Sequence, residues 1–169
     1  ILILFFLIRK IYFRDISVIT SEKIAGHNLY LCFGQNNGFD GFLYEKFIPN
    51  VKFLSFSQEK LGFISKMFFH MVKVAGKNDG KTDKNSPIKL SLEALKDGEA
   101  VAFFNKEMNL SAENRLEFRN TVELVAKEYE KQTGKPLKIM VMGVNYDNLS
   151  MGGKVEIIAK KIGKNDYEA

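Results

Sequence analysis

The amino-acid sequence predicts an α/β fold in which helices flank a central, mostly parallel sheet. Short apolar runs of strand length alternate along the chain with segments whose apolar residues recur at helical spacing, which is the order typical of a sheet covered by helices. One run, Leu29–Phe33, is continuously apolar, as expected for a parallel strand that is buried on both faces. The length of 169 residues fits one domain.

The elements of the first half follow from periodicity and from helix-breaking residues. Residues 15–20 alternate polar and apolar side chains, as a half-buried strand does. Pro49 and Asn50 end a short helix. Residues 61–71 repeat apolar side chains at helical spacing. The expected elements are a helix at 1–13, a strand at 15–20, a strand at 29–33, a helix at 41–47, a strand at 51–56, a helix at 61–71 and a strand at 72–75.

Capping residues mark the elements of the second half. Ser86 and Pro87 suit the N-cap and the first position of a helix, and Gly98 suits its end. Ser111 is placed to cap a long helix that Gly134 stops. The expected elements are a helix at 87–97, a strand at 100–104, a helix at 111–133, and strands at 137–141 and 155–159.

The amino terminus has a pattern of its own. Residues 1–8 are all apolar, and Arg9 and Lys10 follow them. Eight residues are too few to cross a bilayer, which takes about 20. Apolar residues followed by basic ones are typical of the cytoplasmic end of a membrane helix, and a buried terminal helix would show the same pattern. We expect a membrane-proximal apolar helix over residues 1–13, a folded domain over residues 14–169, and a chain that is a fragment of a longer polypeptide.

The amino-acid composition limits the kinds of site and partner that we expect for this chain. A single cysteine, Cys32, excludes an internal disulfide and is expected to be a buried structural thiol. The two histidines, His27 and His70, lie outside any metal-ligand spacing, so no metal site is predicted. A net charge of +5 suits an anionic membrane surface or a nucleic acid. Because no nucleic-acid recognition motif is present, we expect no nucleic-acid partner.

The segment after the buried strand carries the first of four ordered motifs. Leu29–Phe33 is followed by Gln35, and four residues separate Gln35 from Asp40. This arrangement resembles the 1-acylglycerol-3-phosphate (glycerolipid) acyltransferase family, in which a buried strand ends in Asn-His, then four residues, then Asp. The resemblance covers residues 9–163 and is closest to the acyltransferase part of fused acyltransferase/acyl-carrier-protein synthetase proteins.

The resemblance implies that Gln35 and Asp40 occupy the catalytic positions. In the family, the histidine is the general base that removes a proton from an acceptor hydroxyl, and the aspartate orients the imidazole. Gln35 stands in place of that histidine. A glutamine amide can hold a geometry but cannot accept the proton, so the domain is expected to be catalytically impaired.

The other motifs are also altered. The family's phosphate-binding arginine is missing, and Lys73 or Lys77 would meet a phosphate only as a point charge or remain solvated. The Phe-Pro-Glu-Gly motif keeps only its phenylalanine, and in the fourth motif Lys138 replaces a proline while Gly143 is kept. The candidate substrate-binding residues are Lys73, Lys77, Phe104, Asn105, Lys106 and Glu107.

The resemblance implies a phospholipid acyltransferase-like domain with no bound cofactor. Acyl-acyl-carrier protein or acyl-coenzyme A would donate the acyl chain, and a lysophospholipid would accept it. The expected partners are a lysophospholipid or acyl chain and a membrane surface, at the cytoplasmic face of the inner membrane. The main alternative is a non-catalytic lipid-binding or structural domain of a larger membrane protein.

Two further alternatives remain open. An active acyltransferase could use another base, for which His70 is the first candidate, because the length of the strand places His27 at the far end of the sheet from Gln35. A nucleic-acid- or protein-binding module could instead use the lysines. A steep salt dependence of DNA binding would distinguish that module.

Deletion of residues 1–8 is expected to move the chain from the membrane pellet to the soluble fraction, because the apolar run would supply the membrane contact. Cell fractionation followed by immunodetection measures the distribution. Deletion of residues 164–169 is the control and should leave it unchanged. An equal distribution for the two deletions would contradict the prediction.

Overall fold

The computed structural model describes residues 13–33, 40–55, 72–73, 87–105, 112–147 and 153–163. The strands are β1 (Phe13–Thr20), β2 (Leu29–Phe33), β3 (Val51–Ser55), β4 (Val72–Lys73), β5 (Ala100–Asn105), β6 (Ile139–Tyr146) and β7 (Gly153–Ile162). The helices are α2 (Asp40–Phe47), α4 (Pro87–Lys96) and α5 (Ala112–Thr133).

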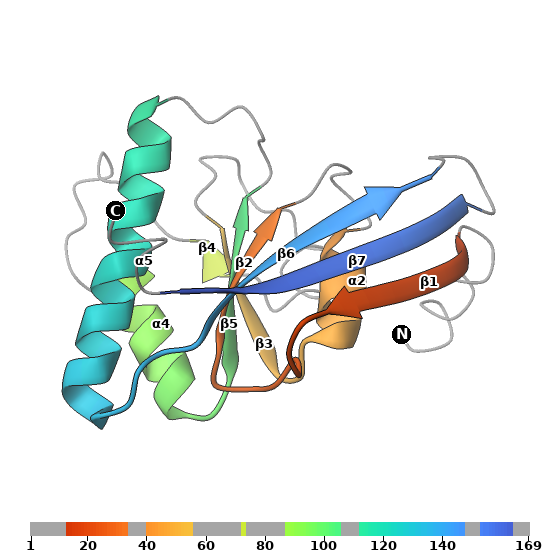
Figure 1. The fold of residues 1–169 in the computed structure, drawn as a ribbon. Helices are drawn as coiled ribbons and strands as arrows, with labels where there is room; N and C mark the ends of the chain where they lie inside the picture. Colours follow the sequence, from red (N-terminus) through yellow and green to blue (C-terminus); the bar gives the residue numbers. More distant parts are fainter. Residues whose placement is uncertain are drawn as a thin grey trace.

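The described strands form one sheet in the order β1-β7-β6-β2-β5-β3-β4 (Figure 1). The five strands from β6 to β4 are parallel to one another. At the other side of the sheet, β7 pairs antiparallel with β6, and β1 pairs parallel with β7. The predicted α/β class and mostly parallel sheet are therefore confirmed.

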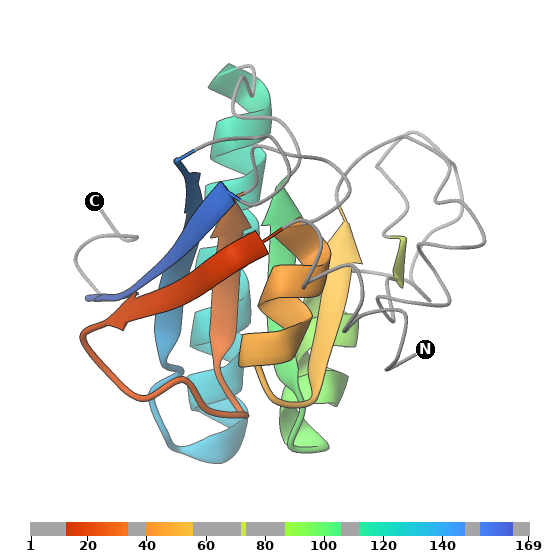
Figure 2. The same ribbon diagram turned by 90° about the vertical axis from the view of Figure 1, so that its right-hand side faces the viewer.

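The helices cover both faces of the sheet. Helix α2 lies against one face, and α4 and α5 lie against the other (Figure 2). The chain passes from β2 to β3 through α2 and from β5 to β6 through α5, in opposite directions along the sheet and on opposite faces. Both crossovers therefore have the same hand, which is the general rule for parallel strands.

Strand β2 lies at the centre of this arrangement. Tyr30 and Cys32 pack in the hydrophobic cluster beneath α2, whereas Leu29 and Leu31 pack in the cluster beneath α4 and α5. Burying an apolar side chain of this size stabilises the fold by about 1.5–3 kcal/mol. Because the strand buries apolar side chains on both faces, its sequence is continuously apolar, as the sequence analysis inferred.

Several predicted boundaries differ from the structure. Phe13, the last residue of the predicted amino-terminal helix, is the first residue of β1, and residues 1–12 lie outside the described residues, as does the predicted helix at 61–71. Strand β6 extends beyond the predicted strand 137–141 at its carboxyl end. Strand β7 extends beyond the predicted strand 155–159 at both ends. The two strands pair with each other from Ile139 to Tyr146. The added residues of β6 alternate as a half-buried strand does, since Met142 and Val144 are buried and Asn145 is exposed.

The substitution Gly98→Ala is expected to destabilise the protein by about 1–3 kcal/mol. Gly98 has a φ of 87°, and an added Cβ would lie 3.1 Å from Cε1 of His27. Urea denaturation measures the change. Gly143→Ala is the matched control, because none of the described residues has an atom within 4 Å of that Cβ position. An equal effect of the two substitutions would contradict the prediction.

Candidate functional site

The candidate site lies at the carboxyl ends of β2, β5 and β6. Phe33, the last residue of β2, is paired with Asn105 of β5 and with Gly143 of β6. The chain leaves β2 toward the face covered by α2, whereas it leaves β5 toward the face covered by α5. Open α/β sheets bind ligands at such a point, where neighbouring strands send their connections to opposite faces.

Asp40 is a buried polar residue at this edge. It is the first residue of α2, and only 1% of its surface is exposed. The hydroxyl of Tyr146, the last residue of β6, donates a hydrogen bond to Asp40 Oδ1. A carboxylate is favourable near the amino end of a helix, and hydrogen bonding offsets the cost of burying it.

Tyr44 lies one helical turn after Asp40 and is fully buried. Its hydroxyl donates to the carbonyl of Phe33 and lies 3.2 Å from the carbonyl oxygen of Met142. The hydroxyl of Tyr44 therefore contacts two neighbouring strands, β2 at its last residue and β6 at Met142.

Burial disfavours the ionised form of both tyrosines. It raises the pKa of Tyr44, and the neighbouring Cys32 and Asp40 raise it further. Burial is also the main reason that the pKa of Tyr146 is raised, followed by the hydrogen bond to Asp40. Both hydroxyl groups therefore stay protonated at neutral pH and can donate their hydrogen bonds.

The predicted site residues are only partly brought together. Asp40 and the backbone of Phe104 and Asn105 lie at the carboxyl edge. Lys73 is in β4, and its partner in the sheet is Ser55 of β3. Because β5 and β3 separate β4 from β2, the backbone of Lys73 is about 14 Å from β2. The remaining predicted site residues lie outside the described residues; they are Gln35, Lys77, Lys106 and Glu107.

The alternative bases have different positions. His27 lies next to Gly98 at the amino ends of the central strands, as its distance from Gln35 in the sequence predicted. The length of β2 separates His27 from the carboxyl edge, so it cannot replace a base there. His70 lies outside the described residues.

Tyr44 and Tyr146 were not predicted from the sequence. Tyr44 could have been found, because it follows Asp40 at a spacing of four and must share a helix face with it. The alternation of Met142, Val144 and Tyr146 could have extended the predicted strand to Tyr146, but its contact with Asp40 arises only in the folded chain.

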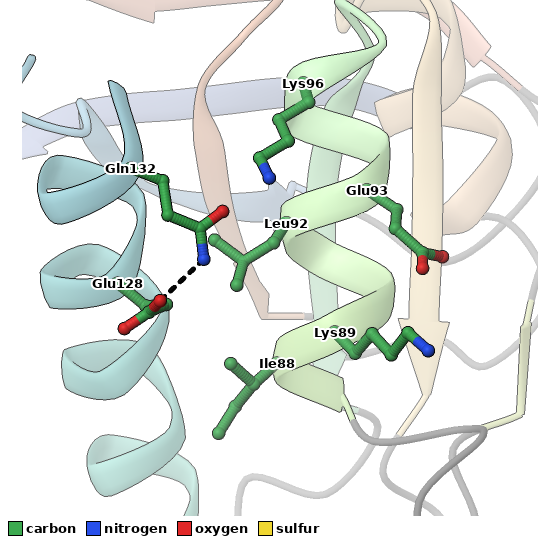
Figure 3. Close-up of a pocket in the computed structure, with 7 residues that line it drawn as sticks. All are labelled: Ile88, Lys89, Leu92, Glu93, Lys96, Glu128 and Gln132. Atoms are coloured by element: carbon green, nitrogen blue, oxygen red, sulfur yellow. Dashed lines mark hydrogen bonds between the residues drawn. The ribbon is translucent and has the colours of Figure 1, made fainter. Parts of the chain in front are cut away.

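A separate depression lies between α4 and α5. It has a volume of about 400 Å³ and is lined by Ile88, Lys89, Leu92, Glu93, Lys96, Glu128 and Gln132 (Figure 3). Gln132 donates a hydrogen bond of 2.6 Å to Glu128. The charges of the two lysines and the two glutamates cancel, and the other residues that line the depression are mainly apolar. These features describe a solvated groove between two helices, so the carboxyl edge of the sheet remains the candidate site.

Comparisons of the chain with protein-family models, with curated proteins and with solved structures found no match. None of the helices in the described residues is long and apolar enough to cross a membrane. Within the same residues, no group of three or more histidine, cysteine, aspartate or glutamate side chains is placed to bind a metal ion.

The free energy of unfolding is expected to fall above about pH 9 because of Cys32. Burial raises the pKa of this thiol in the folded chain, whereas the unfolded thiol ionises near its ordinary value of 9.0. Ionisation then stabilises only the unfolded chain, by about 1.4 kcal/mol per pH unit.

Urea denaturation between about pH 8 and about pH 10 measures this slope. The variant Cys32→Ala should have a smaller slope in that interval, whatever its stability at neutral pH. Equal slopes for the two proteins would contradict the prediction.

Proposed function

We propose that this chain is a glycerolipid acyltransferase-like domain that binds a lysophospholipid or acyl chain at the carboxyl edge of its sheet and transfers acyl groups little or not at all. The observation that carries the proposal is the position of Asp40. Asp40 begins the helix after the central strand and is buried, with a hydrogen bond from Tyr146 at the end of β6. Phe33, the last residue of that central strand, is paired with Asn105 of β5. These are the first and third motifs of the resemblance.

The arrangement of the sheet supports a ligand at this edge. Phe33 and Asn105 are direct neighbours although 72 positions separate them in the sequence. Segments that follow β2 and β5 therefore start side by side. A ligand that contacts both segments would have to lie over the ends of these two strands.

The impairment follows from the chemistry of transfer. In the reaction, the acceptor hydroxyl attacks the thioester carbonyl, its proton passes to a base, and the thiolate of the donor leaves and takes up a proton. Glutamine at position 35 cannot accept that proton.

The chain is expected to transfer a labelled acyl chain from acyl-acyl-carrier protein or acyl-coenzyme A to a lysophospholipid ~10²–10⁴-fold more slowly than an active family member. Gln35→His should recover little of this rate, because the segment that matches the family's phosphate-binding motif has no arginine. Binding of the lysophospholipid, measured by fluorescence with a labelled lipid, should persist in the wild type.

Gln35→Ala is the control for the transfer assay. Fast turnover by the wild type that is lost in Gln35→Ala would overturn the proposal and make Gln35 a catalytic residue. Fast turnover that persists in Gln35→Ala would also overturn it and would indicate a base elsewhere, with His70 the first to substitute.

A further inference from the structure

Two tyrosine hydroxyl groups bind the residues on either side of the connection between β2 and α2. Tyr44 donates to the carbonyl of Phe33, the last residue of β2. Tyr146 donates to the carboxylate of Asp40, the first residue of α2. The point where the chain leaves the central strand and the point where the helix begins are thus both bonded at the same edge of the sheet.

Helix α2 needs such contacts because it is short. It has eight residues, and an isolated helix of about that length is not stable in water. Asp40 and Tyr44 are four residues apart and both are buried, so they lie on the same side of the helix. Each makes a polar contact with the end of a strand, and these contacts set the position of the first turn.

Tyr146 is itself held in place by the sheet. Its backbone is paired with Val155 of β7, and its ring lies 6.2 Å from the ring of Phe13, measured between centroids. A tyrosine hydroxyl is protonated at neutral pH, and burial raises the pKa of Tyr146 further above its ordinary value. Tyr146 therefore gives Asp40 a fixed partner on a different element of the fold.

We propose that Tyr146 is a positioning residue for the candidate site, and that its hydroxyl holds Asp40 and the start of α2 in the place that a ligand at the carboxyl edge requires. The inference rests on the proposed function for the nature of the ligand. The bond between Tyr146 and Asp40 does not depend on that function and is tested separately.

The first experiment measures the affinity of the chain for a fluorescent lysophosphatidic acid. Tyr146→Phe should weaken binding by about tenfold, because losing a hydrogen bond to a charged group leaves about a tenth of the molecules in the binding conformation. Tyr129→Phe is the control, because Tyr129 is also half-buried but packs in the cluster on the opposite face. It should change the affinity by less than about twofold.

Positioning and general loss of stability are distinguished by a double-mutant cycle. Asp40→Ala, Tyr146→Phe and the double variant are compared at a temperature where circular dichroism shows each to be folded. If the two side chains act together, the double variant binds about as weakly as the weaker single variant. If they act independently, the losses multiply to about a hundredfold. That result, or unchanged binding by Tyr146→Phe, would overturn the inference.

The cycle is repeated for unfolding in urea. If the wild type does not bind the lipid, the proposed function fails, and the unfolding cycle alone decides the inference. If the losses in the free energy of unfolding are coupled, Tyr146 positions α2. If those losses are additive, the inference is overturned. If Asp40→Ala does not fold, Asp40→Asn replaces it, because its shape is nearly that of Asp40.

Discussion

The rest of the structure depends on the burial of β2 on both of its faces. A strand that water does not reach must have its backbone groups paired within the fold, and β2 meets this requirement by pairing with β5 and β6. Its side chains must also be covered on both sides. Helix α2 covers one face, and α4 and α5 cover the other. The two crossovers therefore leave the sheet in opposite directions, which creates the candidate site at the strand ends.

The same arrangement connects the core to the site. The ring of Tyr44 packs in the core, while its hydroxyl reaches the carbonyl oxygens of Phe33 in β2 and Met142 in β6. Asp40 is buried but has the hydroxyl of Tyr146 as a partner. Throughout the described residues, no buried side-chain nitrogen or oxygen lacks a hydrogen-bond partner. A polar edge on an apolar core is stable here because its buried polar groups are paired.

The proposed loss of acyl transfer and the proposed role of Tyr146 concern different groups of the chain. Position 35 is glutamine, which cannot accept a proton from an acceptor hydroxyl. Asp40 accepts a hydrogen bond from Tyr146 at Oδ1, and a carboxylate that accepts one bond can accept others. The proposed impairment therefore depends on Gln35, whereas the bond from Tyr146 holds the first turn of α2. The ends of β2 and β5 lie next to each other, where a ligand could be bound without being transformed.

The sequence by itself determined the class of the fold and most of its elements. The run Leu29–Phe33 identified the buried strand, and the cap and stop residues around α4 placed that helix, because these signals depend on neighbours in the chain. The tertiary structure decided the antiparallel pairing of β6 with β7, although the alternation from Met142 to Tyr146 already allows a longer β6. It also decided the bond between Asp40 and Tyr146, since 106 positions separate these residues and only the folded sheet brings them together.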